Sequence, residues 1–283
     1  MNKTVFMLAL VSFLGLGLVV SSSYAAGKTG RSGFMMFNSS DLIGAPVKDS
    51  HGKLMAVVDE VRVDSGGHAF AVVNHGDYDL YGEGGIDNPI PFEALQISKT
   101  KAAQDTIVLK TDMEHLDFAP YLNPLKKETR RDEASIYEYY GIQPYWTRSG
   151  AVRTMGKGGF MELNSLNLIG ASVKNSQGQL LGIVNEILVD SGGHAFAVVN
   201  HGDSDLYGDG GVNTPVPFEA LRFSRTKSGN ESVAFKTEQM DREHLDFAPF
   251  LDPTKTNNRQ YEASIYEYYG LRPYWTENGA STK

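Results

Sequence analysis

Cysteine is absent from all 283 residues of the chain. The protein therefore has no disulfide bond and no cysteine nucleophile, and no cysteine follows the N-terminal apolar run to carry a lipid anchor. Its stability has to come from buried apolar area, or from bound ions or partners. This absence is informative because the next feature predicts export, and exported proteins commonly use disulfides.

Long apolar runs are also lacking, with one exception near the start of the chain. Lys3 precedes an apolar stretch at residues 5–20, and the small residues Ser23 and Ala25 fit the site that signal peptidase reads. This stretch of sixteen residues is short for a membrane span of about 20. The pattern predicts a cleaved signal peptide over residues 1–25, with an uncleaved anchor as the alternative. We therefore expect a periplasmic or extracellular protein with no integral membrane span after cleavage.

Positive charge is scarce as well. The chain has 26 Lys and Arg residues against 34 Asp and Glu, a formal net charge of −8. Nucleic acids and anionic membrane surfaces select for basic patches. Neither is expected as a partner.

What the chain does have is an internal repeat. Residues 63–77 recur without change at 189–203, and residues 133–141 recur at 262–270. The offset between the copies grows from 126 to 129, which places a three-residue insertion near Glu238–Arg242. A loop is expected there.

The repeat divides the chain into two modules. We expect a first module at 34–146 and a second at 160–275, each ending in PYW, with a Gly-, Arg- and Ser-rich linker at 147–159. Two copies are too few for a solenoid. Each copy must close its own core, or pair with the other about a pseudo-twofold axis.

The apolar pattern within one copy predicts short β-strands. A strand is expected to open at 42–44, and residues 54–63 alternate apolar and polar as in a sheet with one wet face. Residues 69–73 are continuously apolar, which is typical of a central strand covered on both sides. Proline places the strand at 90–92 on an edge, and residues 106–110 form the last strand. Five or six such strands joined by turns favour a small barrel.

The end of each copy reads as helical and aromatic. Ser135 and Glu138 have the spacing of a capping box, which predicts a helix start there. Gly141 is a natural stop for that helix. Each barrel is thus expected to carry a short helical, aromatic C-terminal extension.

These segments resemble the PRC-barrel family. The likeness is carried in the first copy by residues 42–47, 49–52, 57–64, 69–73 and 90–95, and in the second by 168–173, 184–190 and 216–221. It covers roughly 75 residues of each copy and consists of apolar and turn patterns. The resemblance implies a mainly β fold of two small antiparallel barrels in tandem. It also implies a non-catalytic module that docks on other macromolecules.

The aromatic extension is the first candidate site. Aromatic side chains dominate the energetics of protein interfaces, so a binding surface is predicted here. The alternative is that the extension folds back and covers the open side of the barrel. The candidate binding residues are Tyr139, Tyr145, Trp146, Tyr268, Tyr274 and Trp275.

A divalent-cation site is the alternative reading. Acidic residues alternate with glycine after residue 76 and again after residue 202, which is the physical logic of a calcium loop, and the repeated histidines suit zinc. A solvated turn is the competing interpretation. The candidate ligands for Ca or Zn are Asp77, Asp79, Glu83, Asp203, Asp205, Asp209, His75 and His201.

No arrangement of residues is typical of catalysis. Asp64, Ser65 and His68 lie together, but on one expected turn, whereas a nucleophile, its base and its orienting group normally converge from separate segments. We therefore expect no enzyme and no catalytic residues. The sequence favours an exported, non-enzymatic interaction or assembly module that binds a protein partner or a second copy of itself, without a cofactor.

Overall fold

The computed structural model describes most of the two repeats. The described residues are 35–76, 85–99, 105–121, 129–148, 162–202, 211–225, 231–252, 254–255 and 258–276. The predicted signal peptide at 1–25 and residues 149–159 of the predicted linker lie outside these ranges. No helix within the described ranges combines the length and the apolar character needed to cross a membrane.

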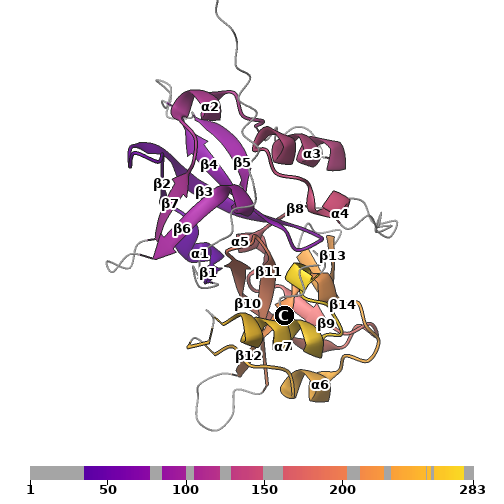
Figure 1. Ribbon diagram of the computed structural model, residues 1–283. Helices are drawn as coiled ribbons and strands as arrows, with labels where there is room; N and C mark the ends of the chain where they lie inside the picture. Colours follow the sequence, from indigo (N-terminus) through magenta and orange to yellow (C-terminus); the bar gives the residue numbers. More distant parts are fainter. Residues whose placement is uncertain are drawn as a thin grey trace, which may run out of the picture. The chain divides into compact units, whose positions relative to one another are not determined.

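The first repeat forms one curled sheet, coloured indigo to magenta in Figure 1. Its strands lie in the order β5-β4-β3-β2-β7-β6, in which β2 and β7 are parallel and the other neighbours antiparallel. The strands are β2 (Pro46–Lys48), β3 (Leu54–Asp64), β4 (Ala69–His75), β5 (Ile86–Pro91), β6 (Leu95–Lys99) and β7 (Asp105–Leu109).

The second repeat forms an equivalent sheet, coloured from salmon to orange in Figure 1. Its order is β12-β11-β10-β9-β14-β13, again with one parallel pair, β9 with β14. The strands are β9 (Ser172–Lys174), β10 (Leu180–Asp190), β11 (Ala195–His201), β12 (Val212–Pro217), β13 (Leu221–Arg225) and β14 (Glu231–Phe235).

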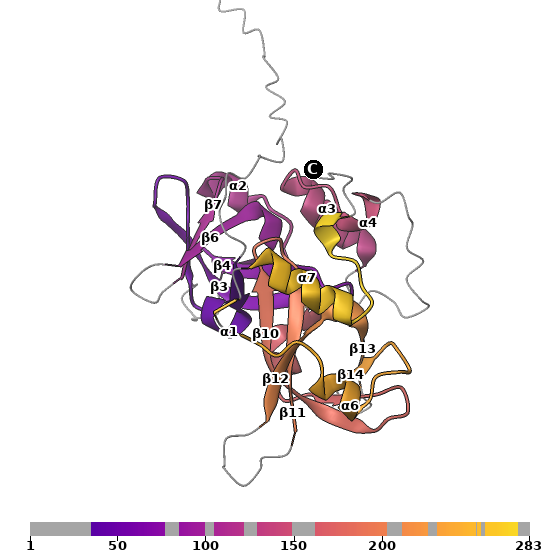
Figure 2. The same cartoon turned by 60° about the horizontal axis from the view of Figure 1, so that its bottom comes forward.

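Short helices complete each half. Figure 2 shows α7 lying across the second sheet, where Ile265 and Tyr266 pack on Phe196. The helices are α1 (Ser39–Leu42), α2 (Met113–Asp117), α3 (Arg130–Tyr139), α4 (Tyr145–Arg148), α5 (Ser165–Leu168), α6 (Arg242–Asp246) and α7 (Arg259–Tyr268). Short 3-10 turns are η1 (Phe92–Ala94), η2 (Phe218–Ala220) and η3 (Tyr274–Thr276).

The predicted β-rich class is confirmed, but the sheets are mixed and open. Among the described strands, pairing in each sheet runs from one edge to the other without closing, and the chain passes from β5 to β6 through the 3-10 turn η1. The expected pair of closed antiparallel barrels is therefore not what the structure has. Each half is a curled sheet, and other parts of the chain cover its faces.

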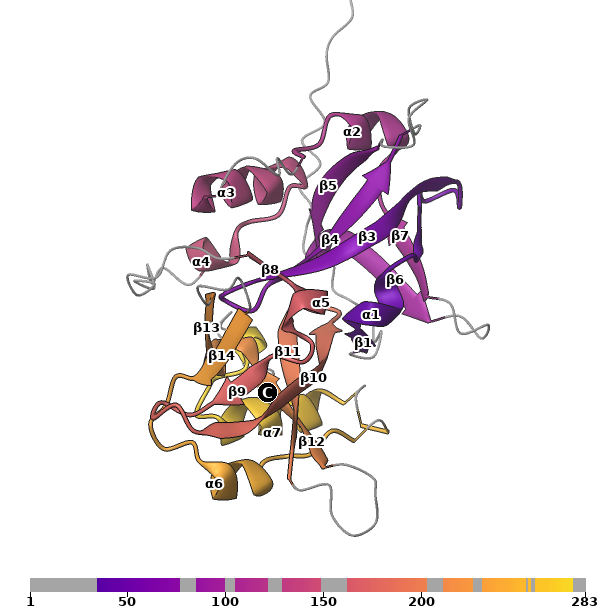
Figure 3. The ribbon, with the colours of Figure 1, turned by 180° about the vertical axis from the view of Figure 1, so that it is seen from behind.

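The two halves exchange their first strands. Strand β1 (Met36–Asn38), which precedes the first sheet, pairs with β10 of the second, with Phe37 opposite Val189. Strand β8 (Glu162–Asn164) reciprocates by pairing with β3, as Figure 3 shows. The halves are thus joined by backbone hydrogen bonds as well as by the chain.

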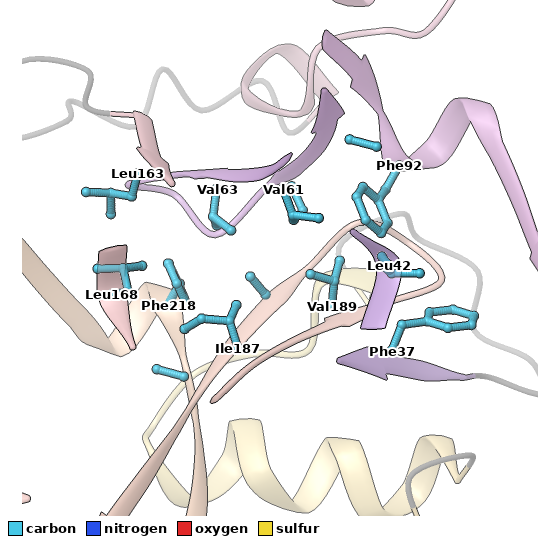
Figure 4. Packing of buried hydrophobic residues seen from close by; sticks show 14 of the residues in the cluster. Phe37, Leu42, Val61, Val63, Phe92, Leu163, Leu168, Ile187, Val189 and Phe218 are labelled. Atoms are coloured by element: carbon cyan, nitrogen blue, oxygen red, sulfur yellow. The ribbon is translucent and has the colours of Figure 1, made fainter. Parts of the chain in front are cut away.

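One core spans both halves as a result. Figure 4 shows it where the two repeats meet. Fully or almost fully buried side chains from both repeats belong to the same apolar cluster. Those labelled in the figure are Phe37, Leu42, Val61, Val63, Phe92, Leu163, Leu168, Ile187, Val189 and Phe218.

The central and edge strands were predicted correctly. Strand β4 is buried on both faces, because its Ala71 side packs into the shared core and Phe70 packs against Tyr137 of α3. Strand β5, which contains Pro89 and Pro91, lies at a sheet edge, where a missing backbone N–H costs least.

Two local predictions were wrong. The strand expected to open at 42–44 begins only at Pro46, because residues 39–42 form helix α1, whose first turn is capped by the Asn38 side chain. Helix α3 begins at Arg130 and not at Ser135, since Thr129 and Asp132 form its capping box. The helix does end as expected just before Gly141, its last residue being Tyr139, and the φ of 66° at Gly141 suits glycine.

Candidate functional site

The aromatic extension covers the outer face of each sheet. In the first half, Ile136 and Tyr137 of α3 pack on Phe70 of β4, and Tyr145 and Trp146 of α4 pack beside them. The second half repeats this arrangement with α7 and η3. The extension therefore serves, at least in part, as the cover that the alternative interpretation expected.

Tyr145 and Tyr274 are committed to contacts inside the protein. The Tyr145 ring stacks on His68 with centroids 3.3 Å apart, and its hydroxyl donates to Asp64 Oδ2 at 2.5 Å. Tyr274 stacks on His194 at 3.4 Å. Burial, and next the Asp64 carboxyl, raise the pKa of Tyr145 well above its ordinary value.

Trp146 and Trp275 carry an arginine on their faces. The guanidinium carbon of Arg130 lies 4.1 Å from the Trp146 ring centroid, and that of Arg259 lies 4.2 Å from the Trp275 centroid. Cation–π contacts of this kind stabilise each pair by about 0.5–2 kcal/mol. These faces of the two indoles are therefore occupied from within the chain.

Tyr139 and Tyr268 are half-buried, and their hydroxyls, in contrast, lie near the surface. Each hydroxyl donates to a backbone carbonyl of the preceding short helix, that of His115 for Tyr139 and that of His244 for Tyr268. Tyr139 also stacks on the His115 ring, with centroids 4.6 Å apart. Among the four tyrosines predicted to bind, the Tyr139 and Tyr268 hydroxyls are less buried than those of Tyr145 and Tyr274.

Tyr139 lines a surface groove of about 610 Å³, here called the Tyr139 groove. Phe118, His115 and Tyr139 form its aromatic part, and three carboxylates face one lysine in its lining, namely Asp49, Asp112 and Glu114 with Lys110. Backbone amides of Lys53 and His51 lower the pKa of Asp49, so this carboxylate is charged at neutral pH. The groove thus combines aromatic surface with negative charge.

Exposed apolar side chains occur at equivalent places in both halves. Phe118 and Phe247 are each 76% exposed, and Tyr121 and Phe250 follow them at 66% and 59%. Further equivalent pairs are Leu54 with Leu180, Val57 with Ile183, and Ile86 with Val212. Three of these five positions differ in residue type between the copies yet stay apolar.

The local structure explains why the phenylalanines face outward. Helix α2 is five residues long and is N-capped by Asp112, and its Leu116 is fully buried. Phe118 occupies the C-cap, where the chain turns away before Ala119 returns to the core. The repeated EHLDFAP motif was visible in the sequence, but it does not show which of its apolar residues faces solvent.

His75 and His201 have protein groups at both ring nitrogens. Nε2 of His75 lies 2.5 Å from Asn88 Oδ1 and its Nδ1 lies 3.3 Å from Asp117. In His201, Nε2 lies 2.9 Å from Thr214 Oγ1 and Nδ1 lies 3.0 Å from Asp246. Burial lowers the pKa of His201. The structure gives both histidines a role in holding β4 or β11 against neighbouring segments.

The predicted acidic ligands cannot be placed. Asp77, Asp79, Glu83, Asp203, Asp205 and Asp209 lie outside the described residues. In the part of the chain that is described, no three His, Asp or Glu side chains are grouped so as to hold a metal ion. Calcium or zinc binding therefore stays a prediction from the sequence.

Asp64 and His68 do lie on one turn, as expected. Asp64 Oδ1 accepts the backbone amides of Gly66 at 2.8 Å and of His68 at 2.9 Å, which closes the turn between β3 and β4. The His68 ring is sandwiched between Tyr145 and His194. The carboxyl thus holds a turn, and the imidazole is stacked on Tyr145, with the tilted His194 ring on its other side.

The comparisons with known proteins leave the family open. No protein-family model and no curated protein matches the chain.

Proposed function

We propose that this protein is a non-enzymatic interaction module that docks on a protein partner. The PRC-barrel resemblance and the predicted signal peptide supply the rest of the proposal, namely two PRC-barrel-like halves acting in the periplasm or at the cell exterior. One observation carries it. Phe118 and Phe247 project from equivalent helix ends with three-quarters of each side chain in solvent.

Exposed aromatics of this kind favour docking for an energetic reason. Burying a phenylalanine side chain contributes about 1.5–3 kcal/mol, and aromatic residues are enriched among interface hot spots. A partner that receives both phenylalanines would bind through two sites on one chain, which raises its apparent affinity. The Tyr139 groove, which Phe118 helps to line, offers an adjacent surface with negative charge.

The test compares baits that differ only at these two residues. The full mature chain and its Phe118→Ser/Phe247→Ser variant are crosslinked in an envelope extract of the source cell, and any captured species is then purified and titrated. The control variant, Leu166→Ser/Ile169→Ser, also removes two exposed apolar side chains, which are 47% and 37% exposed.

We expect one defined species, a protein or a second copy of this chain, to bind the wild type and the control. Binding to the phenylalanine variant should be at least about tenfold weaker, the equivalent of about 1.4 kcal/mol, with an unchanged melting temperature. Equal binding by the phenylalanine variant would refute the proposal, and so would the lack of any species above background with the wild-type bait.

A further inference from the structure

The two halves also meet through a buried polar cluster. The backbone amide of Ala69 donates to the Gly193 carbonyl, and that of Ala195 donates to the Gly67 carbonyl, both at 2.8 Å. His68 and His194 lie between these bonds, with ring centroids 4.4 Å apart. Each ring is capped on its other side by a tyrosine of its own half. We call the ionisable groups around this point the interface cluster.

The first half contributes acids and one arginine to the interface cluster. Asp64 is fully buried and Glu133 nearly so, and Arg130 Nη1 lies 3.1 Å from Glu133 and 3.8 Å from Asp64. Glu93 approaches the His68 ring at 3.9 Å. The first-half members are Asp64, His68, Glu93, Arg130, Glu133 and Tyr145, with Tyr137 packed against them.

The second half contributes the equivalent groups. His194 Nδ1 lies 3.5 Å from Glu219, and Asp190 and Glu262 are both fully buried. The Glu262 and Asp190 carboxyls hydrogen-bond to each other, which requires that one of them carries a proton, and no other group donates a hydrogen bond to Glu262 in the described structure. The second-half members are Asp190, His194, Glu219, Arg259, Glu262 and Tyr274, with Tyr266 packed against them.

The glutamates reach across the boundary between the halves. A Cβ atom placed on Gly67 would lie 3.2 Å from the Glu219 carboxylate, and one placed on Gly193 would lie 3.1 Å from that of Glu93. Each glutamate therefore sits against the turn that holds the other half's histidine. The charge on each glutamate therefore acts directly on ionisable groups of the other half.

The charges of the interface cluster do not balance when all its carboxyls are ionised. Six carboxyl groups face two guanidinium groups and two imidazoles, and burial makes an uncompensated negative charge expensive. Two neighbouring buried carboxyls cannot both ionise at low cost. The folded state is therefore stable only if some of these groups keep a proton at neutral pH.

We propose that the interface cluster is a pH-sensitive latch, which holds the two halves together while Glu262 and His194 keep their protons and loosens as these two groups lose them at alkaline pH. Ionisation of Glu262, together with loss of the imidazolium charge of His194, leaves uncompensated negative charge in the buried cluster. The carboxylates of the two halves then repel each other at the boundary that the exchanged strands hold together.

The pKa directions agree with this geometry. Burial, and next the nearby Asp190 carboxyl, raise the pKa of Glu262 to about 10. Burial also raises the pKa of Asp64. For His194, burial lowers the pKa, but Glu219, Asp190 and Glu93 outweigh it and the pKa is raised. Groups whose pKa is raised in the folded state stabilise it at low pH, and this stabilisation is lost as the pH rises.

The first test is the melting temperature of the full chain between pH 7 and pH 9. This window lies above the range in which His201, whose pKa is lowered, affects stability. The variant Glu262→Gln keeps the shape of the protonated acid but cannot ionise, and Glu267→Gln changes an exposed glutamate of the same helix. We expect the wild type and the Glu267 variant to lose about 5 °C or more over this window. The Glu262 variant should lose less than half as much.

A distance measurement gives a second, independent readout. Because the chain has no native cysteine, Ser50→Cys/Ser176→Cys places two spin labels at exposed, equivalent turns of the two halves. Pulsed electron-resonance distances should lengthen or broaden in the wild-type background from pH 7 to pH 9, and stay unchanged with Glu262→Gln. A flat wild-type melting profile, an equal loss in the Glu262 variant, or pH-independent distances would each overturn the latch. If the variant does not fold, the wild-type distances alone decide the question.

Discussion

Removing the Phe37 ring tests the strand exchange. Phe37 belongs to the first repeat, yet it is fully buried on the edge of the second sheet, opposite Val189. Replacing a buried phenylalanine by alanine costs about 3–5 kcal/mol, through lost burial and the cavity left behind. With a urea dependence of about 3 kcal/mol per molar, Phe37→Ala should lower the unfolding midpoint by about 1 M.

The chain offers a separate probe of each half. It has two tryptophans, Trp146 in the first half and Trp275 in the second. Unfolding of Phe37→Ala is followed by fluorescence in two backgrounds, one with Trp275→Phe and one with Trp146→Phe. Because the core is shared, we expect both probes to report the same lowered midpoint. The exposed control Leu166→Ala should shift it by less than about 0.2 M.

The discriminating result is the behaviour of Trp275. If the halves were independent and β1 packed only on its own repeat, Phe37→Ala would shift Trp146 and leave Trp275 unchanged. That outcome would refute the exchange, and a shift below about 0.3 M at both probes would refute the burial of Phe37. The reciprocal variant Leu163→Ala should behave in the same way, since β8 pairs with β3.

Three further outcomes follow from the same contacts. A chain cut at an engineered protease site within 149–159 should elute from gel filtration as one complex of two fragments, and separate elution would contradict the shared core. Gly66→Ala places a Cβ 2.5 Å from the Tyr145 hydroxyl, so it should cost about 2 kcal/mol in urea unfolding, and a neutral result would argue against the Tyr145 contact. In NMR titrations, His201 should titrate below pH 6.5 because of burial, and His194 above it because of its carboxylate neighbours; the reverse order would show that the local charges are misassigned.

Strand positions could be predicted wherever burial is decided locally. The apolar run at 69–73 is covered on both faces, and such coverage leaves a pattern that can be read without a structure. The start of α3 could not be placed as well, because Thr129 and Ser135 both lie three residues before an acidic side chain. The choice between these two starts is decided by the packing of Tyr137 on Phe70, which requires the helix to begin before Ser135.

The exchange of β1 and β8 could not be read from the sequence for a different reason. The two copies are so similar that a first strand fits the edge of its own sheet and that of the other sheet almost equally well. Pairing about a pseudo-twofold axis was one of two open possibilities. The choice depends on the path of the chain between the strands, which no residue pattern records.

The interface cluster was hidden by sequence distance and by residue type. His68 and His194 are 126 residues apart, and each was seen only as part of a turn. Buried acids such as Glu133 and Glu262 lie on short helices, where glutamate is usually a cap or a solvated residue. The exposure of Phe118 was missed because an apolar residue in a repeated motif is ordinarily taken as part of the core.

Strand exchange and exposed aromatics are connected by the shared core. If each half folded alone, Phe118 and Phe247 would sit on two bodies joined by a linker, and binding through both would carry the entropic cost of bringing those bodies together. The exchanged strands and the interface cluster make one cooperative unit instead, so the spacing of the two phenylalanines is set before a partner arrives. Loosening the interface cluster should therefore weaken the binding of a partner that contacts both halves. The binding of a partner that contacts a single phenylalanine should stay unchanged. In this way the latch would control docking without any change at the docking residues themselves.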